Sequence, residues 1–265
     1  MKADLKILCA DPAGNKTLLI EGNVPAKSYA SLASRLLQTP GLEAEQAGFV
    51  CLPKNGGAGR LEMSGGEFCG NASRAFGYYL GEKFGIRKGC IPIEISGSSS
   101  LVPVTFDQTK GEAYAKMPLP EEIDSIELPA PFGTQTIVRF SGIWHIILPE
   151  VPEDRRTFEC IRESVYKRYQ PEALGVMFLN EEQGSMVPIV YVRGPGTVYE
   201  ESSCGSGTTA VAAWIAQKDP SRTEISLLQP GGILHVKIGR QNGEVTLSMG
   251  GSVSIEKEIQ MSIEL

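Results

Sequence analysis

Two cysteines of this chain have surroundings that could make their thiols chemically active. Cys69 lies in the segment Glu-Phe-Cys-Gly-Asn-Ala-Ser-Arg-Ala-Phe-Gly (67–77), and Cys204 lies in Ser-Ser-Cys-Gly-Ser-Gly-Thr-Thr-Ala-Val-Ala (202–212). Each cysteine follows a glycine-containing turn and precedes an alanine-rich stretch with helical periodicity. The N-terminus of a helix carries unpaired N–H groups and a partial positive charge, which favour a thiolate. We therefore expect both thiols to have a lowered pKa.

The residues that follow each cysteine are small enough to let a ligand approach the helix backbone. The N–H groups of a first helical turn can bind a carboxylate. We therefore predict substrate-binding residues at the two helix starts, namely Gly70, Asn71, Gly205 and Ser206.

A pair of thiols suits a reaction that inverts a carbon centre. Inversion of an amino-acid α-carbon needs one group that removes the proton and another that returns a proton to the opposite face. If Cys69 and Cys204 faced each other, one as a thiolate and one as a thiol, they could do this without any movement of a shared base. We predict that they are the catalytic residues of an enzyme that inverts the α-carbon of an amino acid.

Two other interpretations of these thiols stay open. The pair could form a reversible disulfide in a redox sensor, or the chain could be a catalytically silent relative with a structural role. The four remaining cysteines lack a comparable context, and we interpret them as packing residues: Cys9, Cys51, Cys90 and Cys160.

The elements around the two cysteines recur as an internal repeat. The cysteines are 135 positions apart in a chain of 265 residues, and Gly97 and Gly232 each lie 28 positions beyond their cysteine. In both halves, strand-like segments precede and follow one buried helix. This order predicts an α/β (α+β) fold of two pseudo-symmetric lobes, each a curved, mostly antiparallel sheet around a central helix.

The expected lobes divide the chain near a proline-containing linker at 117–120. The first lobe, 1–118, carries Cys69, and the second, 119–251, carries Cys204. The last stretch, 252–265, is a candidate for a strand that returns to the first lobe. A charged helix near 155–170 is expected on the outside of the second lobe.

The composition excludes several classes of partner. Hydrophobic residues make up 42% of the chain and the net charge is −6, so we expect a packed protein that binds neither nucleic acid nor a membrane. No apolar run is long enough to span a bilayer and no signal peptide is evident, so we expect a cytoplasmic protein with reduced cysteines. There is no Cys-x-x-Cys pair and no phosphate-binding loop, so we predict no metal and no nucleotide.

The cysteine motifs resemble those of a known superfamily. Cys69-Gly70-Asn71 and Cys204-Gly205-Ser206-Gly207-Thr208 look like the two catalytic motifs of the diaminopimelate epimerase superfamily. The resemblance implies a racemase or epimerase that needs no pyridoxal phosphate or other cofactor, and it suggests a homodimer.

The resemblance also implies roles for residues outside these two motifs. Asn15 matches a substrate-contacting asparagine, and His145 matches a histidine that supports the catalytic thiols. Glu201, three residues before Cys204, could tune that thiol as a supporting residue or merely face water.

Two departures argue against diaminopimelate as the substrate. Asn15 is followed by Lys16-Thr17, where diaminopimelate epimerases have Asp-Phe. Their Glu-Arg pair before the second cysteine, which grips the distal end of the substrate, is matched here only by Val192-Arg193. The missing glutamate would leave a distal ammonium without its anchor.

A closer resemblance is to the histidine racemases of staphylopine-type metallophore biosynthesis. It covers most of the chain in the segments 13–17, 45–49, 63–72, 201–208 and 229–232, of which Met63-Ser64-Gly65-Gly66-Glu67-Phe68-Cys69 is quite specific. It implies that L-histidine and D-histidine are interconverted and that Glu45 lies in the substrate pocket, where an acid can accept an imidazole N–H. A broad-specificity racemase, a diaminopimelate epimerase and a proline racemase relative remain the alternatives within the superfamily.

Overall fold

The structure, a computed structural model, describes residues 2–264, and the chain divides into two compact units. The first unit takes the chain up to Lys116 and again from Ser248 onward, and the second is Met117–Leu247. Cys69 belongs to the first unit and Cys204 to the second. No helix in the described part of the chain is long and apolar enough to cross a membrane.

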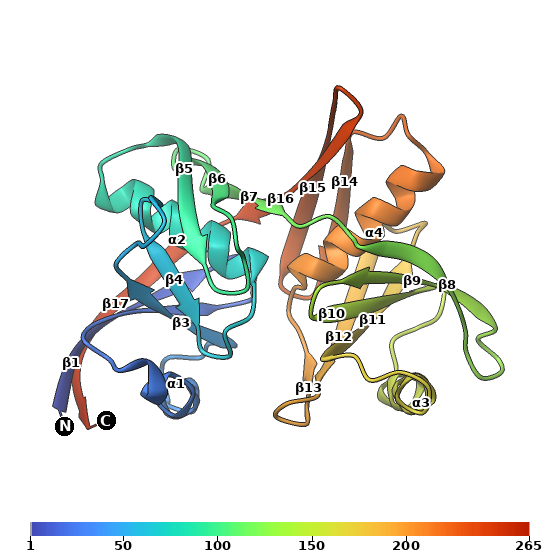
Figure 1. Cartoon of the computed structure of the whole chain (residues 1–265), viewed down its shortest axis with the longest axis horizontal. Coiled ribbons are helices and arrows are strands. Elements are labelled where there is room, and N and C mark those ends of the chain that lie inside the picture. The colour runs from blue at the N-terminus through green and yellow to red at the C-terminus, as the bar shows by residue number, and fades with distance from the viewer. Residues whose placement is uncertain (1, 265) are drawn as a thin grey trace. The chain divides into compact units, whose positions relative to one another are not determined.

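The first unit is built of strands around one buried helix, α2, with a shorter helix, α1, beside them (Figure 1). Its helices are η1 (Ala26–Ser28), α1 (Tyr29–Leu37) and α2 (Gly70–Lys83). Its strands are β1 (Lys2–Asp11), β2 (Thr17–Glu21), β3 (Gln46–Cys51), β4 (Arg60–Met63), β5 (Lys88–Ile95), β6 (Val102–Asp107), β7 (Glu112–Met117), β16 (Glu244–Ser252, which begins in the second unit) and β17 (Ser254–Glu264).

The last strand of the chain closes the first unit against its first strand. β17 pairs antiparallel with β1 along its whole length, from Lys2 opposite Glu264 to Asp11 opposite Ser254. The two ends of the chain therefore lie side by side (Figure 1). The N-terminal strand lies between β17, which pairs with all of it, and β2, which pairs with Lys6–Ala10.

Helix α2 is buried nearly all round, as its alanine-rich, apolar sequence predicts. Every residue from Gly70 to Gly81 is buried. Gly77 lets the helix approach β6 closely, because a Cβ built there would lie 2.5 Å from the side chain of Val104. Tight packing of this kind fixes the position of the residues at the start of the helix.

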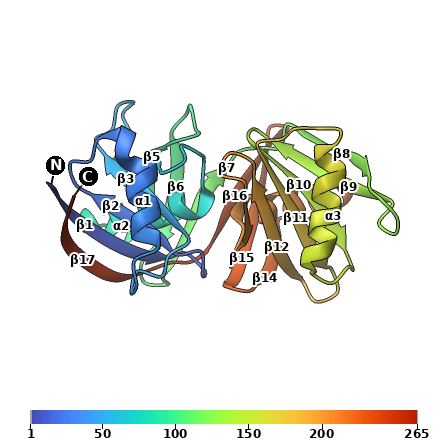
Figure 2. The same ribbon diagram turned by 90° about the horizontal axis from the view of Figure 1, so that it is seen from below.

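The second unit has the same plan around helix α4. Its helices are α3 (Arg155–Tyr166) and α4 (Gly205–Lys218). Its strands are β8 (Glu122–Glu127), β9 (Thr134–Phe140), β10 (Ile143–Pro149), β11 (Ala173–Asn180), β12 (Ser185–Val192), β13 (Thr197–Glu200), β14 (Glu224–Gln229) and β15 (Gly232–Gln241). Helix α3 lies across these strands and buries Phe158, Ile161 and Val165 (Figure 2).

The two units repeat one order of strand pairings, which confirms the predicted α/β class with duplicated lobes. In the first unit β2–β3 is parallel, β3–β4 antiparallel, β4–β5 parallel and β5–β6 antiparallel. In the second unit β10–β11, β11–β12, β12–β14 and β14–β15 follow the same sequence of directions. Helix α1 corresponds to α3, and α2 corresponds to α4.

The sequence patterns missed one helix and overextended another. Helix α1 was not predicted, because it has only nine residues and one narrow buried face of Leu32, Ala33 and Leu36. Helix α3 ends at Tyr166 rather than near residue 170. Its outer face is charged and its inner face is apolar, as expected for a surface helix.

Candidate active site

Each predicted catalytic cysteine is the N-cap of its buried helix. Cys69 has φ −130° and ψ 116°, and its Sγ accepts a hydrogen bond from the N–H of Ala72 at 3.4 Å. Cys204 has φ −112° and ψ 106°, and its Sγ accepts from the N–H of Gly207 at 3.3 Å. The two sulfurs thus occupy the position where a helix N-terminus supplies N–H donors and partial positive charge.

A hydroxyl one turn into each helix reinforces the two caps. Ser73 Oγ donates to the carbonyl oxygen of Cys69 at 2.7 Å, and Thr208 Oγ1 donates to that of Cys204 at 2.6 Å. In the second unit the buried amide of Gln229 adds to this, since it accepts from the Cys204 N–H at 2.9 Å and donates to Thr208 at 2.8 Å. The backbone at both cysteines is therefore held by matched hydrogen bonds.

The surroundings of Cys204 favour its thiol form. The residue is 4% exposed, and burial raises the pKa of its thiol well above the usual value. The nearby carboxylate of Glu201, which accepts a hydrogen bond from the thiol, raises this pKa further, whereas Ser206 and the Gly207 N–H act in the opposite direction. The expectation of a lowered pKa is therefore wrong for Cys204, because the cost of burying a charge exceeds the effect of the helix terminus.

His145 is connected to Cys204 through Ser206. Its Nε2 lies 2.9 Å from Ser206 Oγ, which in turn lies 3.6 Å from Cys204 Sγ. The ring is fully buried, so the pKa of His145 falls to about 3 and the imidazole is neutral. Its Nδ1 has no hydrogen-bond partner among the described residues, so the proton belongs on Nε2, where it is donated to Ser206. Ser206 is then free to donate to the Cys204 sulfur.

Cys69 lies in a more open and more polar environment. It is half-buried, and its thiol donates a hydrogen bond to Gln46 Oε1 at 3.2 Å. The other end of this glutamine, Nε2, donates to Asn15 Oδ1 at 2.7 Å and to Thr17 Oγ1 at 2.9 Å. The carbonyl end of Gln46 is thereby fixed toward the sulfur.

Three amide side chains, Asn15, Gln46 and Asn71, form a hydrogen-bonded group that we call the amide network. Asn15 Oδ1 accepts from Asn71 Nδ2 at 3.0 Å as well as from Gln46. Asn15 Nδ2 donates to the exposed carboxylate of Glu45 at 2.6 Å. The network thus connects Cys69 to an acidic group at the surface of the same unit.

The predicted site residues gather around the cysteine of their own unit. Asn15, Glu45 and Asn71 join Cys69, and Gly70 is the first residue of α2. In the second unit the predicted residues Ser206, His145 and Glu201 join Cys204, and Gly205 is the first residue of α4.

Sequence reasoning missed two glutamines that contact the cysteines. Gln46 accepts from the Cys69 thiol, and Gln229 accepts from the Cys204 N–H. Both stand in segments that resemble the histidine racemases, next to Glu45 and before Gly231-Gly232. That proximity is the only signal that could have singled them out, because a glutamine in a strand has no distinctive pattern.

The other four cysteines do not share one environment. Cys9 is buried, and Cys51 is half-buried with its Sγ 3.3 Å from Tyr29 Oη. Cys90 and Cys160 are exposed, so their interpretation as packing residues is wrong. Both lie at positions of a strand and a helix that face water, which a cysteine alone in a pattern does not reveal.

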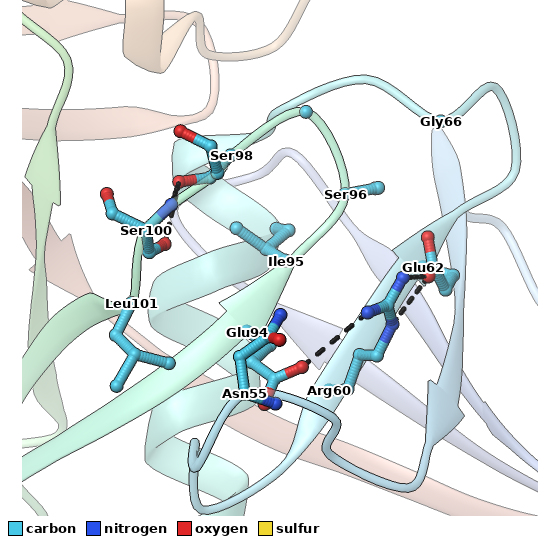
Figure 3. A pocket seen from close by; sticks show the side chains of 12 residues that line it. Asn55, Arg60, Glu62, Gly66, Glu94, Ile95, Ser96, Ser98, Ser100 and Leu101 are labelled. Carbon is cyan, nitrogen blue, oxygen red and sulfur yellow. Dashed lines mark hydrogen bonds and ion pairs between the residues drawn. The ribbon is translucent and has the colours of Figure 1, made fainter.

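A polar pocket of the first unit lies apart from the predicted residues. It is lined by residues that include Asn55, Glu62 and the loop from Ser96 to Leu101 (Figure 3). Arg60 is the one basic residue that lines it, and it is paired with Glu62 and with Glu94 at 3.5 Å. These pairs satisfy the guanidinium, so the pocket offers little to a substrate carboxylate.

The chain is similar to known proteins along nearly its whole length. A model of the family described as "Histidine racemase CntK N-terminal domain" matches residues 4–260. A histidine racemase of Fusobacterium nucleatum is 34% identical over 96% of this chain and 97% of its own length. A histidine racemase of Staphylococcus aureus is 26% identical over 93% of this chain and 96% of its own. The structure of a predicted epimerase from Pseudomonas aeruginosa matches the fold with a TM-score of 0.71, at 14% identity over 97% of this chain and 99% of that one.

Proposed function

The chain belongs to the histidine racemase CntK family, and from that premise we propose that it interconverts L-histidine and D-histidine without a cofactor. As a member of this family it is an isomerase of the racemase type. We further propose that Cys69 and Cys204 are the two acid–base groups, one on each face of the substrate α-carbon.

The matched capping geometry of the two cysteines is the observation that carries this proposal. Both sulfurs accept the N–H of the residue three positions on, at 3.4 and 3.3 Å, and both helices begin at the next residue. Removal of a proton from one face of the α-carbon and return of a proton to the other face need an acid–base group on each face. Duplication of one thiol site in two units supplies such a pair.

In the proposed reaction one sulfur starts as a thiolate and the other as a thiol. The thiolate takes the α-proton, and the electron pair of the broken C–H bond moves onto the α-carbon and its carboxylate. The opposite thiol then donates its proton to the other face, which leaves the two thiols with exchanged protonation. The growing negative charge on the carboxylate is stabilised by the first-turn N–H groups of the helices at Gly70 and Gly205.

We propose that Glu45 recognises the imidazole of the substrate. Its carboxylate is exposed and is held by Asn15 Nδ2 at 2.6 Å, and the amide network connects it to Cys69. A carboxylate can accept the N–H of a histidine ring, and this hydrogen bond is strengthened when the ring is protonated.

The test is incubation of the purified chain with single L-amino acids, without pyridoxal phosphate, followed by chiral separation. We expect D-histidine to form, and we expect Cys69→Ser and Cys204→Ser each to reduce its rate by at least a hundredfold. Cys90→Ser, at an exposed cysteine, is the matched control and should keep full activity. Faster conversion of diaminopimelate, proline or lysine than of histidine would contradict the substrate assignment.

A further inference from the structure

Arg74 is a fully buried arginine on the helix that begins after Cys69. Its relative exposure is 0%, and it lies in α2, five residues beyond the cysteine. Arginine is almost never fully buried unless it is paired, because removal of a charge from water costs several kcal/mol. Packing alone therefore does not explain why an arginine is buried at this position.

The hydrogen bonds of Arg74 do not neutralise its charge. Nε donates to Asn71 Oδ1 at 3.1 Å, and Nη1 donates to the carbonyl oxygen of Ser252 at 2.7 Å. Both acceptors are neutral. Nη2 is buried and has no hydrogen-bond partner within residues 2–264. A buried cation thus lies beside the Cys69 site with one donor unsatisfied.

The guanidinium also determines how the amide network is oriented. Because arginine can only donate, Asn71 must turn its oxygen toward Arg74 and its nitrogen toward Asn15. The glutamine that contacts Cys69 joins the same Asn15 oxygen. Arg74 therefore supports, from inside the unit, the orientation that the Glu45 carboxylate supports from the surface.

The charge of Arg74 interacts electrostatically with Cys69. Burial lowers the pKa of Arg74 to about 9, which still leaves it charged at neutral pH. Among the groups whose negative charge favours the guanidinium, Cys69 is the strongest, followed by Asp11 and Tyr114. Electrostatic attraction is mutual, so a charged Arg74 stabilises a thiolate at Cys69 by the same amount that the thiolate stabilises Arg74.

We propose that Arg74 is a positioning residue whose buried, unbalanced charge stabilises the negative charge that forms at Cys69. This inference rests on the proposed function, in which Cys69 is a thiolate in one half of the catalytic cycle. When the Cys69 proton is transferred to the substrate carbon, the S–H electron pair stays on sulfur and the new negative charge is balanced by the guanidinium. The cost of burying Arg74 is thus offset in the state that the reaction needs.

The experiment measures the ionisation of Cys69 directly, without any need for turnover. Wild type and the variants Arg74→Gln, Arg74→Met and Arg74→Lys are labelled with iodoacetamide across a pH series, and mass spectrometry follows the peptide that contains Cys69. Since only the thiolate reacts, the rate reports its population. We expect both uncharged variants to need a pH about one unit higher, which is a rate about tenfold lower at neutral pH. Arg74→Lys, which keeps the charge, should stay within about threefold of wild type.

Lys83→Met is the matched control, because it removes a positive charge from the exposed end of the same helix, where Lys83 pairs with Glu21. Its labelling profile should equal that of wild type. Two uncharged replacements of different shape guard against a variant that fails to fold, which thermal unfolding would reveal. The proposal would be overturned if all Arg74 variants were labelled at the wild-type rate. It would also be overturned if Arg74→Lys were slowed as much as the uncharged variants. If the Arg74 variants were labelled as expected but the wild-type chain did not racemise histidine, the result would instead count against the proposed function.

Discussion

Burial and the Glu201 carboxylate oppose the ionisation of the Cys204 thiol more strongly than Ser206 and the Gly207 N–H favour it. Cys204 is buried beside the carboxylate of Glu201. Cys69 is half-buried and faces the carbonyl end of an amide. In the proposed mechanism the raised pKa of the Cys204 thiol makes this residue the proton donor of the resting enzyme.

Replacement of Glu201 should ease the ionisation of Cys204. Since its negative charge raises the pKa of the Cys204 thiol, Glu201→Gln should shift the corresponding limb of the pH profile of kcat/KM to lower pH by about one unit. Glu200→Gln, at an exposed neighbour in β13, is the control and should leave the profile in place. An unshifted profile in the Glu201 variant would show that this carboxylate does not act on the thiol.

The Glu45 variant tests substrate recognition separately from proton transfer. Glu45→Gln removes the charged acceptor proposed for the imidazole and should raise KM for histidine by about tenfold, the loss of one charge-assisted hydrogen bond. The value of kcat should change much less, because the cysteines are untouched. Glu43→Gln, two residues earlier and also exposed, serves as the control. A fall in kcat with an unchanged KM would contradict the assigned role.

At the residue scale, the sequence motifs chose residues that lie together in the structure, but the expected pKa of the Cys204 thiol was wrong. The short motifs around Cys69, Cys204 and Asn15 were sufficient to select positions that the structure groups with hydrogen-bonding partners. The protonation of Cys204 could not be predicted, because it depends on burial by segments distant in sequence. Gln46 and Gln229 were missed for the same reason, since only the fold brings them to the cysteines.

At the scale of elements, the start of each central helix positions a cysteine that we propose to be catalytic. Both helices are buried almost all round, so their first residues cannot shift without disturbing the core. Their alanine-rich sequences made them easy to predict. Helix α1 was harder, because its nine residues bury only one side.

Gly207 offers a test of how tightly the second helix start is packed. A Cβ built there would lie 2.1 Å from the sulfur of Met177 and 3.2 Å from Cys204 Sγ. Gly207→Ala should therefore lower the free energy of unfolding by about 1–3 kcal/mol. It should also reduce kcat, even after correction for the fraction of the protein that is unfolded. Gln217→Ala, at the exposed end of the same helix, should change stability by less than about 0.5 kcal/mol. Chemical denaturation with parallel kinetics measures both, and a Gly207 variant with normal kcat would contradict a tightly held cap.

At the scale of the whole molecule, two units repeat one arrangement of helices and strands. The spacing of Cys69, Cys204 and their following glycines predicted this duplication together with the matching order of strand-like and helical segments. The pairing of β17 with β1 joins the two ends of the chain in the first unit. The sequence predicts this pairing only weakly, because β17 has no fully buried residues and alternates between exposed and partly buried ones.

The buried imidazole of His145 should make stability depend on pH. Its pKa is about 3 in the folded protein, against an ordinary value of 6.5. Below about pH 6.5 the unfolded chain binds a proton that the folded chain does not, so the free energy of unfolding should fall by up to about 1.4 kcal/mol per pH unit as the pH decreases toward 3. His145→Gln should flatten this dependence in denaturation experiments between pH 4 and 7, whereas His235→Gln, at a half-buried histidine, serves as the control. An equal slope in wild type and the His145 variant would contradict a neutral buried ring.

The most direct test of the central claim follows the α-hydrogen when L-histidine is converted in deuterium oxide. If one thiol removes the proton and a different thiol returns a deuteron, the first D-histidine formed carries deuterium at the α-carbon, while the recovered L-histidine still carries its original hydrogen. NMR and mass spectrometry of the separated enantiomers at a few per cent conversion provide the measurement. If the D-histidine kept the substrate hydrogen, or if the remaining L-histidine gained deuterium as fast as product formed, a single base would be at work and the assignment of Cys69 and Cys204 to opposite faces would be wrong.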